Sequence, residues 1–172
     1  MLTQRYSFKL ALSASEVNAY FELRQTIFCQ EQELFTDSDV DDIDRYAYPI
    51  VAIAREATGL NSVVGVVRIY ESEPRLWYGG RLGVHQDYRR AGRIGKGLIY
   101  KAVTTANAWG CDRFFATVQL QNVSFFQRLH WQSLAEIAIC NCPHHLMEAD
   151  LNYYPPNTEP RPVLAFGTRE AC

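Results

Sequence analysis

A strand end, a polar turn and the start of a helix follow one another in Leu82-Gly-Val-His-Gln-Asp-Tyr-Arg-Arg-Ala-Gly-Arg-Ile-Gly-Lys-Gly-Leu98. Four cationic side chains and three glycines fall between residues 89 and 97. Glycines let backbone N–H groups approach a ligand, and a helix N-terminus adds unpaired N–H donors and the positive end of the helix dipole. The stretch is therefore typical of a phosphate or pyrophosphate site, although a solvated helix cap can have the same composition.

Two familiar nucleotide-binding loops do not match this spacing. Gly97 stands where a P-loop has the Ser or Thr that holds Mg²⁺, and Arg90 replaces its first glycine. A dinucleotide fingerprint is excluded as well, because its glycine spacing differs and no acidic residue ends a strand about 20 residues further on.

The same segment resembles motif A of the GNAT superfamily of acyl-CoA N-acyltransferases. Leu82-Gly-Val84, Tyr88-Arg-Arg-Ala-Gly92 and Gly95-Lys-Gly-Leu98 match that motif in order, with one residue inserted before the second glycine. The resemblance implies that backbone at Leu82 and Val84 holds the pantetheine arm of acetyl-CoA and that the 89–97 loop holds its pyrophosphate. Cofactor contacts are accordingly expected from Leu82, Gly83, Val84, Arg89, Arg90, Gly92, Arg93, Ile94, Gly95, Lys96, Gly97, Asn122 and Phe126.

A second segment, Gln121-Asn-Val-Ser-Phe-Phe-Gln-Arg-Leu-His-Trp131, resembles a shortened form of another motif of that superfamily. The match places Asn122 near the cofactor and Phe126 where many members have a tyrosine that protonates the CoA thiolate. Phenylalanine has no such proton to give. A catalytically silent CoA-binding sensor or partner module therefore stays open beside the enzyme.

Composition limits the class of protein. A chain of 172 residues that is 48% hydrophobic suffices for one well-filled domain, and its net charge of −2 disfavours a general nucleic-acid binder. No apolar run approaches the length of a membrane span, and the N-terminus has no signal-peptide core. We expect a cytoplasmic protein with no membrane or nucleic-acid partner, and a homodimer is left open.

Hydrophobic periodicity and turn residues predict the order of elements. The expected class is α/β (α+β): a mixed, mostly antiparallel sheet of about seven strands, splayed at the motif A strand, with about four helices. Residues 1–154 would form the single domain, and residues 155–172 an irregular, loosely held tail with prolines. Expected elements are a strand at 5–11, a helix from a capping box at Ser13 to Ile27, strands at 48–56, 63–70 and 76–84, a helix ending at Gly110, a strand at 114–120, a short helix at 121–131 and a hairpin of 133–140 with 145–151.

Two finer expectations concern the motif A strand. Gly79-Gly80 lies inside it and indicates a β-bulge or a close approach by a ligand. The strand, helix and strand that follow one another predict a right-handed crossover, in which 82–84 neighbour 116–119.

An acidic loop follows the first helix and carries Asp37, Asp39, Asp41, Asp42 and Asp44. These carboxylates repel one another unless a cation is near. The loop is either a solvated surface or a wall of the acceptor site that attracts an amine. It is not a calcium loop, because the glycine and glutamate required at fixed positions are missing.

The five cysteines, at 29, 111, 140, 142 and 172, have no framework spacing, so reduced thiols are expected. Cys140-Asn-Cys-Pro-His-His145 raises the question of a metal. Cys-x-Cys is a poor chelating spacing, and Asn-Cys-Pro is typical of a turn between strands. No metal is expected.

Transfer of an acyl group to an amine needs a base. Glu71 and Glu73, at the end of the middle meander strand, lie where many superfamily members place such a carboxylate, and His145 could act as base or acid because its ordinary pKa is near 6.5. Glu31 is a further candidate. Aromatic residues that could line the acceptor pocket are Phe21, Phe28, Phe35, Trp77 and Tyr78.

The function expected from the resemblance is acetyl-CoA-dependent N-acyl transfer to a primary amine of a small molecule. Gln119-Leu-Gln-Asn122 with the following Phe-Phe-x-Arg-Leu-His-Trp is most similar to a bacterial branch encoded beside nitrilases and linked to nitrogen starvation. Leu23-Arg-Gln25, Ile27-Phe28 and the acidic loop also resemble acyl-homoserine-lactone synthases, which share the fold. A synthase of that kind, using an acyl carrier, is the same-fold alternative.

Overall fold

The computed structural model describes residues 5–163. One seven-stranded sheet has the order β1-β2-β3-β4-β5-β7-β6, and only its β4–β5 pair is parallel. This confirms the predicted mixed, mostly antiparallel sheet. The elements are β1 (Tyr6–Leu10), α1 (Ala14–Arg24), β2 (Tyr48–Arg55), β3 (Asn61–Glu73), β4 (Leu76–Val84), α2 (Arg93–Ala108), β5 (Arg113–Gln119), α3 (Val123–Arg128), β6 (Trp131–Ile139) and β7 (Cys142–Ala149).

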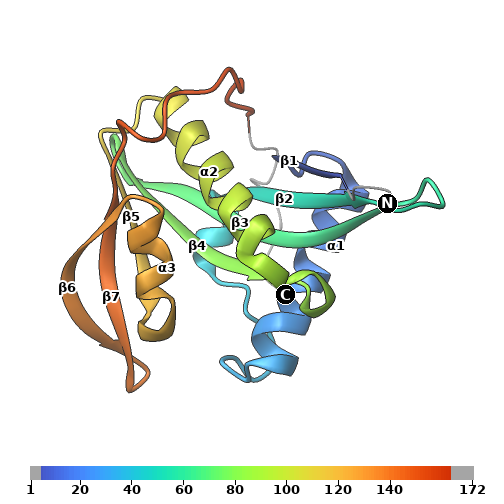
Figure 1. Cartoon of the computed structure of the whole chain (residues 1–172), viewed down its shortest axis with the longest axis horizontal. Coiled ribbons are helices and arrows are strands. Elements are labelled where there is room, and N and C mark those ends of the chain that lie inside the picture. The colour runs from blue at the N-terminus through green and yellow to red at the C-terminus, as the bar shows by residue number, and fades with distance from the viewer. Residues whose placement is uncertain (1–4, 164–172) are drawn as a thin grey trace.

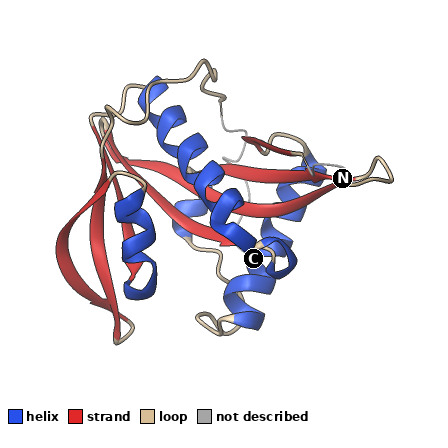
Figure 2. Ribbon diagram, in the orientation of Figure 1, coloured by secondary structure: helices blue, strands red, loops and turns tan. Residues whose placement is uncertain are grey.

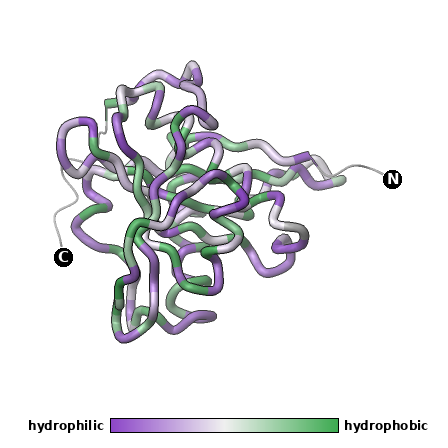
Figure 3. The backbone as a smooth tube through the Cα atoms, turned by 60° about the vertical axis from the view of Figure 1, so that its left-hand side comes forward, coloured by the Kyte–Doolittle hydropathy of each residue, from purple (hydrophilic) through white to green (hydrophobic). Residues whose placement is uncertain are grey.

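Helices cover both faces of the sheet, with α2 in front of the central strands and α1 behind them (Figures 1 and 2). Gly65 in β3 lets α2 approach, since a Cβ there would lie 2.8 Å from Leu98. Gly83 in β4 does the same on the other face, where a Cβ would lie 2.8 Å from Ile27. Hydrophobic and hydrophilic residues are mixed along the chain (Figure 3). Residues 48–52 of β2 and 64–69 of β3 are buried without a break, as strands covered on both faces require.

The first helix begins as the sequence predicts. The Ser13 hydroxyl accepts a hydrogen bond from the Glu16 N–H, and the Glu16 carboxylate accepts one from the Ser13 N–H, which completes the capping box. Beyond Arg24 the helix continues as a π-helix over Gln25–Glu31. Such segments are rare and often occur at functional sites. The described residues form three α-helices, namely α1, α2 and α3, where about four helices were expected.

The bulge in β4 lies one residue after the position predicted for it. Gly79 and Gly80 pair in regular register with Ile69 and Arg68, whereas the step from Arg68↔Gly80 to Val66↔Gly83 takes three residues of β4 against two of β3. Arg81 holds the irregular position with φ of +52°. A left-handed non-glycine residue has no simple sequence signature, which explains the misplaced expectation.

The parallel pairing of β4 and β5 is short. It covers Leu76↔Arg113, Trp77↔Phe114 and Tyr78↔Phe115, after which β5 pairs only with β7. The expected adjacency of 82–84 to 116–119 is therefore wrong as strand pairing. The predicted splay at the motif A strand is instead what the structure shows, and Figure 1 shows β4 and β5 diverging.

The β6–β7 hairpin turns earlier than predicted. Ile139 pairs with Cys142, and the two residues between them, Cys140 and Asn141, both have positive φ (50° and 61°), as a type I′ turn requires. Pro143 and His145 therefore lie within β7 rather than in or just after the turn.

The described part of the C-terminal tail is irregular but not loosely held, so that expectation is wrong. Asn157 donates to the hydroxyl of Thr105 at 2.8 Å, and the Trp109 indole N–H donates to the Glu159 carbonyl at 2.8 Å. Arg161 lies over the ring of Trp77. Residues 155–163 thus lie along α2. No helix within the described range 5–163 is long and apolar enough to span a membrane.

Candidate active site

The divergence of β4 and β5 leaves an open strand edge at residues 79–84. His85 donates its N–H to the Val64 carbonyl at 2.8 Å, so its backbone faces β3. Because direction alternates along a strand, the N–H and carbonyl of the preceding residue, Val84, face the open side. Consistent with this, the Val84 carbonyl accepts a hydrogen bond from the Arg89 side chain at 2.8 Å rather than from a strand.

The open edge leads into the N-terminus of α2. Gly92 is the N-cap residue with φ of +65°, a conformation that favours glycine. The first-turn amides of a helix have no intrahelical acceptor, and the helix dipole is positive there. Among the described residues, the exposed Arg90, Arg93 and Lys96 form no ion pair. Backbone donors and free cations therefore meet beside the open strand, as the sequence predicts for a pyrophosphate site.

The glycines of the loop have separate roles. A Cβ on Gly97 would lie 2.1 Å from the Phe8 ring, so this glycine lets α2 pack on β1. Its N–H also lies beyond the unpaired first-turn amides, because the carbonyl of Arg93 is four residues earlier in α2. A Cβ on Gly92 would lie 3.0 Å from Phe125, whereas one on Gly95 would meet that ring at 3.9 Å. The structure thus gives Gly97 a packing role, which the sequence did not indicate.

Arg89 has partners of its own. Its Nε donates to the Val84 carbonyl, and its other end forms an ion pair with Glu31 at the end of the π-helix. Arg89 therefore fixes the end of β4 against the α1 side of the sheet instead of offering a free guanidinium to phosphate. The sequence suggested Glu31 only as a base.

Three other expected cofactor residues differ in exposure. Ile94 and Phe126 are buried, Ile94 against Gly65 and Phe126 edge-to-face with Trp131 at 5.1 Å, so their side chains belong to the core. Asn122 is exposed at the start of α3. Only Asn122 of the three presents its side chain to solvent.

The acidic loop is largely neutralised from within. Arg24, fully buried, donates to Asp39 at 2.7 Å and to Asp44 at 2.7 Å and 3.0 Å. Arg68 donates to Asp41 at 2.6 Å, and Arg81, at the bulge, donates to Asp39. We call these six residues the Arg–Asp cluster. Because its charges cancel, the cluster supports neither alternative for these aspartates in full: their charge does not attract a cationic amine, and Asp39 is buried rather than solvated. Asp37 and Asp42 are exposed.

Charge pairing sets the protonation of this cluster. Burial works to raise the pKa of Asp44, but hydrogen bonds and charge from Arg24, reinforced by Arg68, hold that pKa below its ordinary value. Asp41 is held low in the same way by Arg68. Burial also raises the pKa of Tyr20 to about 12, so its hydroxyl stays protonated as it accepts from Arg24.

A row of aromatic rings crosses the sheet where the opening begins. Tyr46 meets Tyr70 edge-to-face at 5.9 Å, Tyr70 stacks on Tyr78 at 5.7 Å, and Tyr78 contacts Phe115 at 5.5 Å. Tyr78↔Phe115 is also the last β4–β5 pair. The row lies on the face of the Arg–Asp cluster, since Arg68 and Tyr70 alternate with core residues in β3.

Only Tyr78 of this row was expected from the sequence. The period-two alternation of their strands could have predicted that Tyr70 and Phe115 share a face with Tyr78. Tyr46 lies in a loop, where the sequence has no periodicity from which its position could be predicted. Trp77, expected in the pocket, is fully buried on the opposite face, and Phe28 is buried under the sheet. Phe35 lies 4.5 Å from the Arg81 guanidinium.

The three expected catalytic residues are not brought together. Glu71 pairs with Trp77, in the part of β4 that is still paired with β5, so it lies outside the opening. Its carboxylate accepts hydrogen bonds from the Arg161 side chain and from the Arg75 N–H. Glu73 is exposed at the β3–β4 turn. His145 lies in β7 opposite Val118 of β5, and its Nδ1 is 2.6 Å from the Ser133 hydroxyl. No local sequence pattern indicates Ser133 as a partner of His145.

The cysteines and histidines form no metal centre in the described part of the chain, where no group of three or more His, Cys, Asp or Glu side chains could hold an ion. Cys29, Cys111, Cys140 and Cys142 are free thiols. Burial raises the pKa of Cys111 to about 12, so this thiol stays protonated at neutral pH.

Known proteins are similar to this chain in family and in fold. The model of the acetyltransferase (GNAT) family matches residues 17–131. Solved structures with a similar fold include an acyl-CoA N-acyltransferase from Pseudomonas aeruginosa, with 18% identity, a TM-score of 0.69, and coverage of 86% of this chain and 100% of that chain. ElaA from Escherichia coli has 21% identity, a TM-score of 0.70 and coverage of 86% and 100%.

A CoA-dependent acyl-homoserine lactone synthase, BjaI, solved with SAM and isopentyl-CoA, has 18% identity and a TM-score of 0.67, with coverage of 88% of this chain and 86% of that chain. At these identities the solved structures show the fold alone. No curated protein sequence matches the chain.

Proposed function

Because the chain belongs to the acetyltransferase (GNAT) family and is an N-acyltransferase, we propose that it transfers an acetyl group from acetyl-CoA to a primary amine of a small molecule. The observation that carries this proposal is the open edge of β4, which ends at Val84 and leads directly to the glycine-capped N-terminus of α2. An amide-bearing arm can pair with the edge, and a pyrophosphate can bind the helix N-terminus.

The residues present fit acetyl-CoA. The N–H groups of Leu82 and Val84 would bind the pantetheine arm, and the first-turn amides of α2 with Arg90, Arg93 and Lys96 would bind the pyrophosphate. The acyl end would then lie toward Tyr78 and Phe115, where the opening begins. Bound in this way, acetyl-CoA supplies an activated thioester: the amine nitrogen forms the new C–N bond, the C–S bond breaks, and the thiolate leaves and is protonated.

The amine must lose a proton during this reaction. Of the three expected candidates we propose His145, because it is the one on a strand next to β5, which forms one side of the opening. Glu71 already has Arg161 and Arg75 as partners, and Glu73 lies at the hairpin turn. His145→Asn should lower kcat at neutral pH while leaving the KM for acetyl-CoA nearly unchanged; an unchanged kcat would exclude His145 as base.

An acyl-homoserine-lactone-synthase-like reaction is the second candidate, because the solved synthase BjaI shares the fold. A pyrophosphate-binding loop would disfavour a synthase that takes its acyl group from a carrier protein instead of CoA. BjaI is described as CoA-dependent, so that loop alone does not separate the two reactions. A catalytically silent CoA-binding module is the third hypothesis, suggested by phenylalanine rather than tyrosine at position 126.

Free-thiol release, measured together with product identity, distinguishes the three candidate functions. The chain would be mixed with acetyl-CoA and a panel of small primary amines, with amide products identified by mass spectrometry, and separately with acyl-CoA and S-adenosylmethionine. Amine-dependent thiol release with an amide product supports the proposal. Lactone formation supports the synthase, and saturable CoA binding without release in any arm supports the silent module.

We further propose that the enzyme belongs to the bacterial branch encoded beside nitrilases and acts in nitrogen metabolism in the cytoplasm. The segment from Gln119 to Trp131 supports this placement. Induction of the gene by nitrogen starvation would test it, and expression indifferent to nitrogen supply would count against it.

A further inference from the structure

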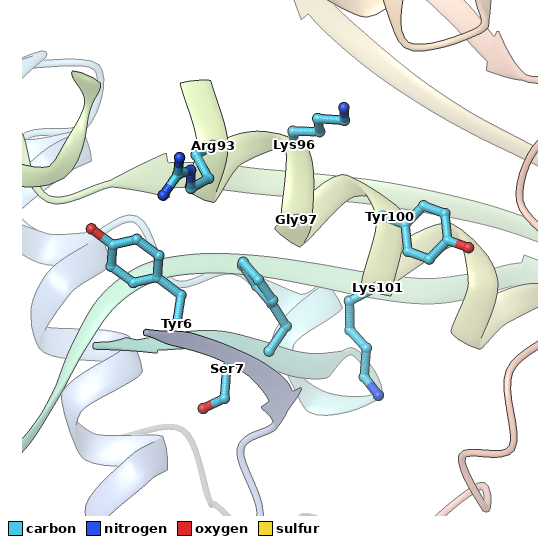
Figure 4. Close-up of a pocket in the computed structure, with 8 residues that line it drawn as sticks. Tyr6, Ser7, Arg93, Lys96, Gly97, Tyr100 and Lys101 are labelled. Carbon is cyan, nitrogen blue, oxygen red and sulfur yellow. The ribbon is translucent and has the colours of Figure 1, made fainter. Parts of the chain in front are cut away.

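A groove of about 500 Å³ lies between β1 and α2, on the side of α2 away from the β4–β5 opening. This volume is in the range of small-molecule sites. Its walls include Tyr6 and Phe8 from β1 and Arg93, Lys96, Tyr100 and Lys101 from α2 (Figure 4). The function proposed above makes no use of most of these residues.

Aromatic rings form both sides of the groove. Tyr6 and Phe8 are two residues apart in β1, so their side chains leave the strand on the same face, toward α2. The Phe8 ring lies against Gly97, where any side chain would collide with it. Tyr100, one helical turn beyond Gly97, is an exposed ring on the α2 side. Flat apolar surfaces of this kind accept a planar ring by stacking.

The groove is also positively charged. Arg93 and Lys96 form no ion pair with any other residue in the range 5–163, and the α2 dipole begins at Arg93. Figure 4 shows Arg93 turned toward the Tyr6 ring and Lys96 extending from the rim. Lys101 is neutralised by Glu159 at 3.0 Å. None of the described lining residues is acidic. The charge that fits here is therefore an anion at the Arg93 end.

We propose that this groove binds a nucleotide-type ligand: a planar ring held among Tyr6, Phe8 and Tyr100, carrying phosphate that binds Arg93 and Lys96. Arg93 suits phosphate because its planar guanidinium can make two parallel hydrogen bonds. The ligand has two potential sources, the nucleotide end of a CoA molecule seated in the β4–β5 opening or a separate nucleotide. The residues proposed to form the site are the same for both sources.

The test uses adenosine 3′,5′-bisphosphate as the probe in calorimetric titrations of the full chain. Wild type should bind it. Arg93→Ala should weaken binding about tenfold or more through loss of a charged hydrogen bond, and Tyr100→Ala about fivefold or more through loss of stacking. Arg128→Ala is the charge-matched control, because Arg128 is exposed on α3 and forms no ion pair with another described residue. Circular dichroism would confirm that each variant is folded.

Absence of binding to the folded wild-type chain would overturn the proposal. An unchanged affinity in Tyr100→Ala would also overturn it, since the probe would then bind only at the α2 N-terminus. A loss of affinity in Arg128→Ala equal to that in Arg93→Ala would overturn it as well. A second titration, of the Tyr100→Ala variant with acetyl-CoA, identifies the source, because Tyr100 lines the groove but is not among the residues assigned to the pantetheine arm or the pyrophosphate. A loss of acetyl-CoA affinity parallel to the loss for the probe assigns the groove to the nucleotide end of CoA, and an unchanged acetyl-CoA affinity assigns it to a separate nucleotide. Probe binding with no acetyl-CoA binding would leave the groove standing while the proposed function fails.

Discussion

Replacing Arg24 by methionine should destabilise the protein strongly. The Arg24 side chain is 0% exposed and donates hydrogen bonds to Asp39, Asp44 and Tyr20. Methionine fills a similar volume but offers no donor and no charge. The substitution would leave two carboxylates, 1% and 7% exposed, with part of their pairing removed.

The size of the stability loss depends on the ion pairs that Asp39 and Asp44 keep. Loss of one partner of a buried ion pair costs about 3 to 5 kcal/mol when the other is left unpaired. Here Arg81 still bonds Asp39 at 3.1 Å and Arg68 still lies 3.0 Å from Asp44, so each carboxylate keeps one cation. We therefore expect a loss near the lower end, about 3 kcal/mol, which for a domain of this size lowers Tm by roughly 6 to 12 °C.

Urea denaturation followed by circular dichroism measures this loss directly. Asp42→Asn is the matched control within the same loop, because that side chain is 94% exposed and its ion pair, at 3.6 Å, is with the exposed Arg45. The control should unfold with wild-type stability. A loss below about 1 kcal/mol in Arg24→Met, within the range of exposed pairs, would refute the claim that the Arg–Asp cluster holds the loop in place.

Other perturbations follow from the same contacts. Asp44 has a lowered pKa, so its stabilisation is complete above its ordinary pKa of about 3.9 and is lost as pH falls through the lower folded-state value; acid denaturation should be less steep in Asp44→Asn, and an identical slope would contradict this. Gly97→Ala should cost about 1 to 3 kcal/mol in thermal unfolding because its Cβ meets Phe8, whereas Gly95→Ala should not; equal effects would count against the packing role. Maleimide labelling at pH 8, read by mass spectrometry, should leave the native Cys111 unmodified, since burial raises its pKa to about 12; labelling as fast as at the exposed hairpin cysteines would argue otherwise.

Local patterns were sufficient to predict most of the fold. Ser13 and Glu16 specify a capping box three residues apart, and Gly110, with φ of +89°, ends α2 as a C′ glycine. Strand alternation predicted the meander, and the basic loop with its helix start was placed correctly. These features depend on residues that are close in sequence, so the sequence alone expresses them.

Features that depend on distant partners were not predicted. The aspartates of the acidic loop pair with Arg24, Arg68 and Arg81, which lie on three different elements. Gly97 is required by Phe8, which is far away in the chain. Neither relationship has a local signature. The tail was expected to be loose because its prolines prevent regular structure, but its side chains and carbonyls bind α2 instead.

The same reasoning explains the mixed result at the site. The loop composition correctly indicated backbone donors and free cations at Gly92 and Arg93. It could not show that Arg89 is held by Glu31 and Val84, because that contact joins the π-helix to the end of β4. We therefore assign Arg89 to positioning the strand edge rather than to phosphate.

Residue-resolved hydrogen exchange of the full chain, with and without saturating acetyl-CoA, tests the central claim most directly. The open edge of β4 and the first turn of α2 should bind the ligand through backbone N–H groups. Exchange should therefore slow at Leu82, Val84 and the amides of residues 93–95. Saturable binding that leaves all of these amides exchanging at their original rates would contradict the account.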